Sequence, residues 1–185
     1  MSIMNVYESK KPIGIQINPD LNVCIVKENS LTGEKTWFYT HNIVTNDGDL
    51  YYAQQAVEAT PTSDFGGSDG RMELRTGSAT PAKAHVYSDV TTPVTASRKA
   101  IDNTYPKVND DDSDNTGSGT DIATWRTSWT TSDFNATAII GGCVHVGGAS
   151  PASGTKLLTH FSITSFNKTA SDTLKIFVNH TFNGV

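Results

Sequence analysis

The last third of the sequence constrains the fold more than any other part. Apolar and polar residues alternate along four short segments that are separated by turn-forming residues, at 122–131, 137–146, 156–166 and 173–182. Alternation with a period of two places successive side chains on opposite faces of a strand, so each segment predicts a half-buried β-strand. Four strands within about sixty residues are typical of an antiparallel sandwich or jelly roll.

The rest of the chain favours the same fold class. Shorter strand patterns occur at 13–17, 21–26, 35–44 and 72–75, and 25 threonines and 17 serines among 185 residues are typical of strands and turns. One helix is expected at about 49–59, where Leu50, Ala53 and Val57 recur at helical spacing behind Asp49 as the capping residue. We predict an all-β, antiparallel sandwich or jelly-roll-like fold with one short helix and long polar loops.

A chain of 185 residues and 19.9 kDa has the size of one domain. We expect a single β-sandwich domain over residues 21–185, preceded by an extended N-terminal arm over residues 1–20. The string NDDDSDNTGSGTD at 109–121 begins with twelve residues that carry no large apolar side chain. Such a segment has nothing to bury, so the sequence predicts an exposed loop there.

Charge and hydropathy disfavour several classes of partner. The formal net charge is −5 and no more than two basic residues are adjacent, so the chain lacks the basic patch that binds DNA or RNA. No apolar run approaches the roughly 20 residues that cross a bilayer, and the first residues contain no apolar signal-peptide core. We therefore expect that the protein binds no nucleic acid and no membrane, and that it is made in the cytoplasm. Cys24 and Cys143 stand far apart without metal-ligand spacing and are expected in the core.

The acidic loop is the one candidate metal site. Asp110, Asp112, Asp114 and Asp121 fall at positions one, three, five and twelve of an EF-hand-like spacing, and carboxylate oxygens suit Ca²⁺. The match is incomplete because Asn115 stands where a glycine is needed and no flanking helices are predicted. Clustered carboxylates in a loop are more often simply solvated. No cofactor is expected, with Ca²⁺ as the one alternative.

No catalytic signature stands out, and we expect no enzymatic activity. His145, His160 and His180 lie in predicted strands and gather if those strands pair, but histidines spread through a sheet are more often structural. Trp125 and Trp129 alternate along one predicted strand. A core position is favoured for both because an indole buries a large apolar area, and an exposed platform for a sugar is the alternative.

Several strings occur together in a recognisable order. They are HNIVTNDG at 41–48, ELRTGSATP at 73–81, YPK at 105–107 before the acidic loop, TWR at 124–126, and FNKTASDTLKIFVNHTF at 166–182. The set resembles small virion structural proteins of tailed bacteriophages, in which an N-x-V-x-N-x-G start, a T-G-S/T-x-x-P middle and a D-T-L-x-V-x-V/N ending recur. The resemblance covers most of residues 40–185.

The resemblance implies a virion component without enzymatic activity that is symmetric and multimeric. Among virion roles, a capsid decoration or cement protein is preferred, with the major capsid protein and further copies of the chain as partners, in a trimer. The arm would add a strand to an exposed edge of the shell or of a neighbouring subunit. Its candidate contact residues are apolar: Ile3, Met4, Val6, Tyr7, Ile13 and Ile15.

Two alternatives stay open on the sequence alone. The first is a neck or tail component of the same virion, such as an adaptor or a fibre base. The second, from a different class, is a carbohydrate-binding sandwich that uses Trp125 or Trp129 together with Ca²⁺ in the acidic loop. The first differs from a decoration protein in copy number, and the second requires an exposed tryptophan.

Overall fold

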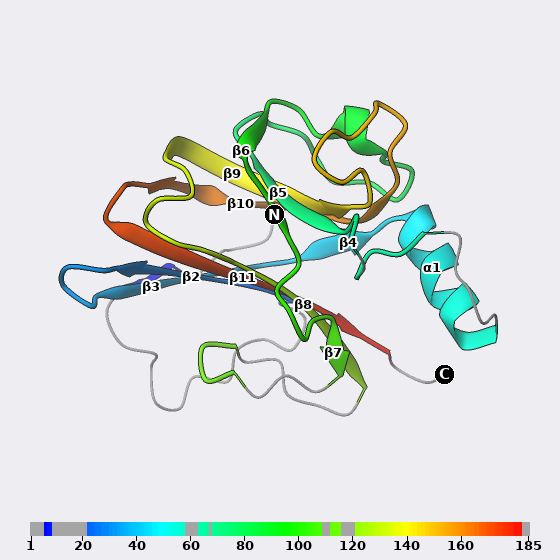
Figure 1. The fold of residues 1–185 in the computed structure, drawn as a ribbon, viewed down its shortest axis with the longest axis horizontal. Coiled ribbons are helices and arrows are strands. Elements are labelled where there is room, and N and C mark those ends of the chain that lie inside the picture. Colours follow the sequence, from blue (N-terminus) through cyan, green and yellow to red (C-terminus); the bar gives the residue numbers. More distant parts are fainter. Residues whose placement is uncertain are drawn as a thin grey trace.

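The computed structural model describes the backbone of residues 6–8, and residues 22–57, 63–66, 68–108, 112–115 and 121–182 with their side chains. Two antiparallel sheets lie face to face, and one α-helix lies at an end of the sandwich (Figure 1). The predicted all-β fold is confirmed. Within the described ranges, no helix has the length and apolar content that crossing a bilayer requires.

The six-stranded sheet has the order β1-β3-β2-β11-β8-β7, and the five-stranded sheet has the order β4-β10-β9-β5-β6. The strands of the first are β1 (Val6–Glu8), β3 (Lys35–Thr40), β2 (Val23–Asn29), β11 (Asp172–Thr181), β8 (Ile122–Trp129) and β7 (Lys107–Val108). Those of the second are β4 (Asn42–Val44), β10 (Leu157–Lys168), β9 (Ala136–His145), β5 (Arg71–Arg75) and β6 (Pro93–Ala100). The helix α1 spans Asn46–Val57, and a 3₁₀ turn, η1, spans Tyr87–Asp89.

The four strands predicted near the C-terminus are present as β8 to β11, and their alternating apolar residues fill the space between the sheets. Trp125 and Trp129 are only 1% and 2% exposed, so the core positions favoured for them are confirmed. The indole Nε1 of Trp129 donates a hydrogen bond to the Ser97 carbonyl at 2.7 Å, which ties β8 to β6 across the sandwich. Cys24 and Cys143 are both buried, as expected.

The segment predicted as one strand at 35–44 is divided between the sheets. It ends in the six-stranded sheet with β3 and resumes after His41 in the five-stranded sheet as β4. At the crossing, Thr40 Oγ1 donates to the Ser162 carbonyl at 2.6 Å, and the Asn42 backbone N–H donates to Asn22 Oδ1 at 2.8 Å. These bonds provide partners for polar groups at the point where the chain passes from one sheet to the other. The alternation in the sequence does not reveal that the chain changes sheets here.

The predicted helix exists, but its start and its buried face differ from the expectation. Thr45, not Asp49, caps it: Thr45 Oγ1 accepts the Gly48 N–H at 3.2 Å, and the Thr45 carbonyl accepts the Asp49 N–H at 2.9 Å. Leu50 and Val57 are 44% and 82% exposed, whereas Tyr51 is buried. The Tyr51 ring packs edge-on against Phe65 and Trp125, so burial of this aromatic ring sets the orientation of the helix. Residues 58–59 of the predicted helix lie outside the described residues.

Replacing Trp125 by alanine tests the core position. We expect the free energy of unfolding to fall by about 3–5 kcal/mol, because a large cavity opens between the sheets. Chemical denaturation monitored by far-UV circular dichroism measures the change. Leu31→Ala is the matched control, since the Leu31 side chain is 82% exposed in a turn and its removal should have little effect. An unchanged midpoint for the tryptophan variant would contradict the core position.

Candidate functional site

A group of polar side chains is buried on the outer face of the five-stranded sheet. Glu73 and Arg75 alternate along β5 with the core residues Met72 and Leu74, so the two charged residues point away from the core. Both are 0% exposed. Charged side chains in such positions are almost never fully buried unless they are paired, so their surroundings define the most unusual environment in the described chain.

The strand register places two rows of residues across this face. In one row Glu73 of β5 lies opposite Cys143 of β9, which in turn lies opposite His160 of β10. The neighbouring row contains three further residues in the same strand order: Arg75, Gly141 and Ser162. His145 of β9 and Arg98 of β6 complete the group. We call Glu73, Arg75, Arg98, Cys143, His145 and His160 the covered face.

Two covering segments, residues 76–92 and 147–156, lie over this face and shield it from solvent; both run above the five-stranded sheet in Figure 1. They are joined to each other by backbone hydrogen bonds of 2.9 Å, from Tyr87 N–H to the Thr155 carbonyl and from Ser88 N–H to the Ser153 carbonyl. Val90 of the first segment packs with Cys143 of β9 and Leu157 of β10 in a small apolar cluster. The covering segments therefore act as one layer.

Glu73 holds this layer to the sheet. Its carboxylate accepts two hydrogen bonds from Arg98, Nε to Oε2 at 3.1 Å and Nη2 to Oε1 at 2.9 Å, and a third from the Tyr87 hydroxyl at 2.8 Å. His145 Nε2 lies 3.4 Å from Glu73 Oε2. His145 Nδ1 accepts the Gly147 N–H at 3.1 Å, which leaves Nε2 on the side of the ring that faces Glu73.

These contacts decide the ionisation of Glu73. Burial alone would raise the pKa of its carboxyl group, but the contacts with His145, Arg98 and Tyr87 outweigh burial and hold the pKa below its ordinary value of 4.5. The same arrangement raises the pKa of Tyr87 to about 12, through burial first and its bond to Glu73 second. Glu73 is therefore a carboxylate at neutral pH, and Tyr87 is a permanent donor.

Arg75 is held differently, by neutral oxygen atoms. Its Nη2 donates to Ser162 Oγ at 2.5 Å and to the Ala79 carbonyl at 2.8 Å, and its Nη1 donates to the Gly77 carbonyl. The side chain lies across β9 at Gly141, where an added Cβ would be 2.7 Å from Arg75 Nε and 2.4 Å from the Phe161 carbonyl. Glycine at 141 is therefore the condition that allows the arginine of β5 to reach β10.

The cysteine and histidine of the covered face are not an activated pair. Burial lowers the pKa of His160 to about 3, helped by the nearby Arg75 and His85, and His160 Nδ1 lies 2.9 Å from His85 Nδ1. Burial, together with the charge of Glu73, raises the pKa of the Cys143 thiol well above its ordinary value. A neutral imidazole and a protonated thiol suit packing, whereas a nucleophile would need the thiolate.

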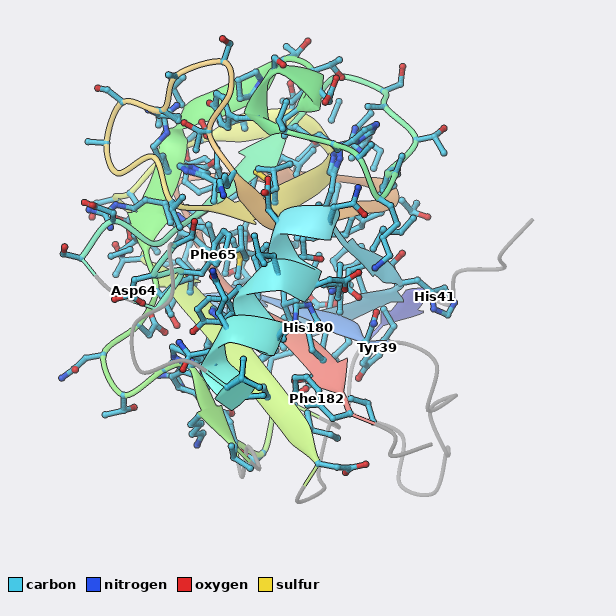
Figure 2. All side chains as sticks on the ribbon, turned by 90° about the vertical axis from the view of Figure 1, so that its right-hand side faces the viewer. Tyr39, His41, Asp64, Phe65, His180 and Phe182 are labelled. Atoms are coloured by element: carbon cyan, nitrogen blue, oxygen red, sulfur yellow. The ribbon has the colours of Figure 1, made fainter. Side chains whose placement is uncertain are left out.

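His145, His160 and His180 do not gather at one point. His145 contacts Glu73, His160 contacts His85, and His180 is in the other sheet beneath α1, as Figure 2 shows. His180 Nε2 accepts from Asn42 Nδ2 at 2.6 Å, and its Nδ1 is hydrogen-bonded to the Tyr52 hydroxyl. Burial lowers the pKa of His180 to about 3, so the ring is neutral and fastens the helix to β11.

Two of the predicted calcium ligands are engaged in ion pairs. Asp112 Oδ2 lies 2.9 Å from Arg126 Nη1, and Asp114 contacts Lys35 at 2.9 Å and Lys175 at 3.0 Å. Burial would raise the pKa of Asp114, but hydrogen bonds from the two lysines hold it below its ordinary value. Within the described ranges, no three histidine, cysteine or acidic residues are grouped for a metal. A cation at Asp112 and Asp114 would have to displace these ion pairs.

The remaining parts of the acidic segment have separate outcomes. Asp110 lies outside the described residues, and Asp121 is exposed at the start of β8. Asp114 and Asn115 are each only 7% exposed, which corrects the prediction that the whole of 109–121 is an exposed loop. The Asn115 side chain forms a reciprocal pair of hydrogen bonds, at 3.0 and 3.1 Å, with Asn179 of β11. Part of this segment therefore packs on the outer face of the six-stranded sheet.

Only part of the predicted arm can be located. Val6 and Tyr7 belong to β1, which pairs with β3 at the edge of the six-stranded sheet, and only their backbone is described. Ile3, Met4, Ile13 and Ile15 lie outside the described residues. The contacts expected of these side chains stay predictions.

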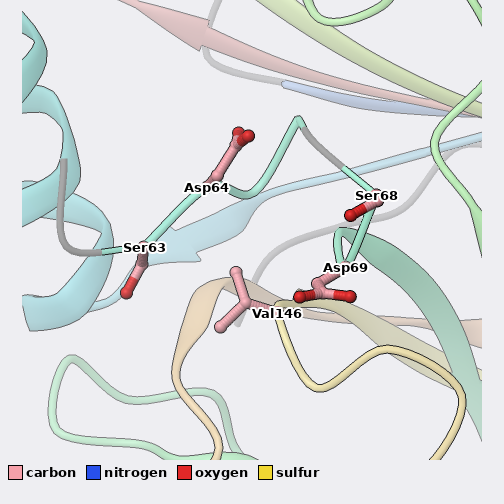
Figure 3. A pocket seen from close by; sticks show the side chains of 5 residues that line it. All are labelled: Ser63, Asp64, Ser68, Asp69 and Val146. Carbon is pink, nitrogen blue, oxygen red and sulfur yellow. The ribbon is translucent and has the colours of Figure 1, made fainter. Parts of the chain in front are cut away.

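A small polar hollow of about 210 Å³ lies beside the 63–70 segment, lined by Ser63, Asp64, Ser68, Asp69 and Val146 (Figure 3). The two carboxylates point in different directions in the figure, and Asp64 Oδ1 accepts the Gly66 N–H at 3.1 Å. The hollow therefore presents no paired acids. The aromatic platform for sugar is also unsupported, because Trp125 and Trp129 are buried.

Comparison of the chain with protein-family models, with curated proteins and with solved structures found no match.

The alternation of apolar and polar residues predicts β5 as a strand, but it does not reveal the covered face. Glu73 and Arg75 alternate with apolar residues, a pattern that normally indicates a solvent-facing side. One feature of the sequence could have indicated the covered face: glycines stand at 141 and 142 inside a strand pattern. Glycines in a strand often mark a place where other groups approach the backbone closely. That signal does not say which group approaches, because the partner lies more than sixty residues away in β5.

Glu73→Gln tests the role of this carboxylate. We expect the free energy of unfolding at pH 7 to fall by about 3–5 kcal/mol, because Arg98 is left largely buried without its counter-charge. Urea denaturation measures the change. Asp49→Asn is the matched control: its ion pair with Lys83 is about half exposed on both sides, so its loss should change stability by only about 0.5 kcal/mol.

The same variant carries a pH signature. The folded pKa of Glu73 is depressed below 4.5, so its contribution to wild-type stability is complete above that value and is lost as pH falls through the folded pKa. The difference in stability between wild type and Glu73→Gln should therefore shrink in acid. A difference that stays constant from pH 7 to pH 3 would contradict this assignment.

Proposed function

We propose that this protein is a structural component of a bacteriophage virion, most specifically a capsid decoration protein. In this role it stabilises the head through contacts with the major capsid protein and with further copies of itself, as a trimer. The resemblance of the strings between residues 41 and 182 to small virion proteins supports this role. A sandwich whose outer faces are fastened by buried ion pairs is a suitable scaffold for it.

The observation that carries the proposal is the position of β1. This strand, Val6–Glu8, joins the six-stranded sheet at its edge through antiparallel pairing with β3, in the register Val6 to Phe38 and Glu8 to Thr36. The start of the chain thus forms structure by adding a strand to an existing edge. The same backbone hydrogen bonding suits the edge of a capsid subunit or of a neighbouring copy.

The chemistry of the covered face also favours a structural role. Glu73, His160 and Cys143 are groups that enzymes use, yet here burial and internal contacts set their ionisation for packing. Activated catalytic groups instead need access to a substrate and a pKa matched to the reaction. We therefore propose that the protein acts by binding other proteins and has no enzymatic activity.

The copy number in purified particles tests the role directly. Quantitative mass spectrometry against the major capsid protein should give a nearly stoichiometric ratio, corresponding to hundreds of copies, and light scattering of the isolated protein should give a trimer. About six or twelve copies per particle would instead indicate a neck or tail component. Absence from particles would overturn the virion role altogether.

Deletion of residues 1–12 tests the arm. We expect the shortened protein to remain folded, because the strands that enclose the core all follow residue 22, and to lose binding to particles. Sedimentation with undecorated particles measures binding, and circular dichroism checks the fold. A full-length variant with residues 1–12 in scrambled order is the matched control for length and charge. Retained decoration by the deletion variant would show that the arm is not the attachment element.

A further inference from the structure

Arg75 carries a buried positive charge, and no ion pair joins it to a carboxylate within the part of the chain that the structure describes. Its side chain is 0% exposed, and its described contacts are the hydroxyl and carbonyl oxygens of the covering segment and of β10. Among the described residues, its Nε has no hydrogen-bond partner. Burial lowers the pKa of the guanidinium from its ordinary value, although an arginine stays charged at any ordinary pH.

The nearest acid on the same strand is already committed. Glu73, in the neighbouring row, accepts hydrogen bonds from Arg98 and Tyr87 and contacts His145. Its arginine partner is therefore Arg98. Among the described residues, the buried Arg75 and the largely buried Arg98 lie on neighbouring strands, and a carboxylate pairs with Arg98 alone. Buried charges in proteins are normally paired, so Arg75 is the exception that calls for a partner.

A surface hollow opens beside this unpaired charge. It has a volume of about 390 Å³ and is lined by Arg75 with Ser78, Thr80, Ile140 and Ser162 among its neighbours. Ser78 and Thr80 are exposed, and Ser162 is half-buried. The hollow therefore combines exposed hydroxyl-bearing residues with a buried positive charge in its lining.

The hollow is built from one of the strings that the sequence analysis singled out. In ELRTGSATP, the arginine is Arg75, and the Gly77 and Ala79 carbonyls that follow accept hydrogen bonds from its guanidinium. Ser162 Oγ accepts from Arg75 at 2.5 Å and donates to the Ala79 carbonyl at 3.1 Å. These contacts fix both the charge and the wall of the hollow, so a ligand would meet a preformed site.

We propose that this hollow, which we call the Arg75 hollow, is a binding site for a carboxylate group. A carboxylate would place its negative charge near the guanidinium and accept hydrogen bonds from hydroxyls of the lining, which satisfies the unpaired buried cation. A cation is repelled by the same charge, and a neutral group leaves it uncompensated. The site is a property of this chain and does not depend on the proposed virion role.

The first test is a titration of the full-length protein followed by NMR. Sodium acetate is the probe, and sodium chloride at equal ionic strength is the reference. We expect saturable shifts of the backbone amide signals of Ser78, Thr80 and Ser162 with acetate and only small, non-saturating shifts with chloride. Identical responses to the two salts would overturn the site.

The second test adds a carboxylate beside Arg75 by substitution. Arg75 itself is kept, because the fold needs its buried hydrogen bonds. Thr80→Glu places an acid in the lining of the hollow. We expect it to abolish the acetate shifts and to raise the thermal midpoint, because the buried cation is then paired within the chain. Thr181→Glu, at an exposed threonine at the end of β11 in the other sheet, is the control with the same charge change. Unaltered acetate binding in Thr80→Glu would overturn the proposal.

The source of the carboxylate is distinguished with two peptides. One is a capped Gly-Gly-Glu-Gly-Gly peptide, and the other has glutamine in place of glutamate. Tighter binding of the glutamate peptide than of acetate indicates a carboxylate side chain presented by a polypeptide, whereas acetate binding at least as tight indicates a small free carboxylate. Equal responses to the glutamate and glutamine peptides, without an acetate response, would overturn the site.

Acetate binding is measured on the isolated protein, so a negative titration leaves the copy-number result unaffected. Conversely, absence of the chain from particles leaves the carboxylate site intact. The two proposals therefore fail separately.

Discussion

Glu73 is a fully buried carboxylate in the middle of a sheet face, and a charge in that position is tolerated only when hydrogen bonds replace the water it has lost. Arg98 comes from the neighbouring strand, His145 from β9, and Tyr87 from the covering segments. Meeting this one requirement joins three strands, β5, β6 and β9, to the layer above them. The covered face depends on these contacts, because Tyr87 attaches the covering segments to the sheet through Glu73.

The six-stranded sheet is protected on its outer face by the same kind of interaction. Asp114 reaches Lys35 of β3 and Lys175 of β11, while Asn115 pairs with Asn179, so a polar segment is fastened over strands that are far from it in sequence. Polar residues that looked free to bind a metal or solvent thus hold loops against sheets.

Arg75 and Glu73 show why the covered face could not be predicted from the sequence. Both sit in a strand that the alternation identifies, and on the pattern alone each is expected to face water. Whether a face is open or covered depends on segments 76–92 and 147–156, whose positions are set by contacts across the whole chain. The helix shows the same limit: Leu50 and Val57 fit a buried stripe, yet Tyr51 occupies the buried side because Phe65 and Trp125 lie there.

The sequence by itself determined the strand segments of the C-terminal third, the burial of Trp125 and Trp129, and the β-sandwich class, because period-two alternation and large apolar area are local properties of the chain. Only the tertiary structure decided the sheet change at His41, the capping of the helix by Thr45 and the row that joins Arg75 to Ser162 across Gly141. These features depend on which distant strands become neighbours. Strand order and register arise from the packing of the complete core, so no local pattern contains them.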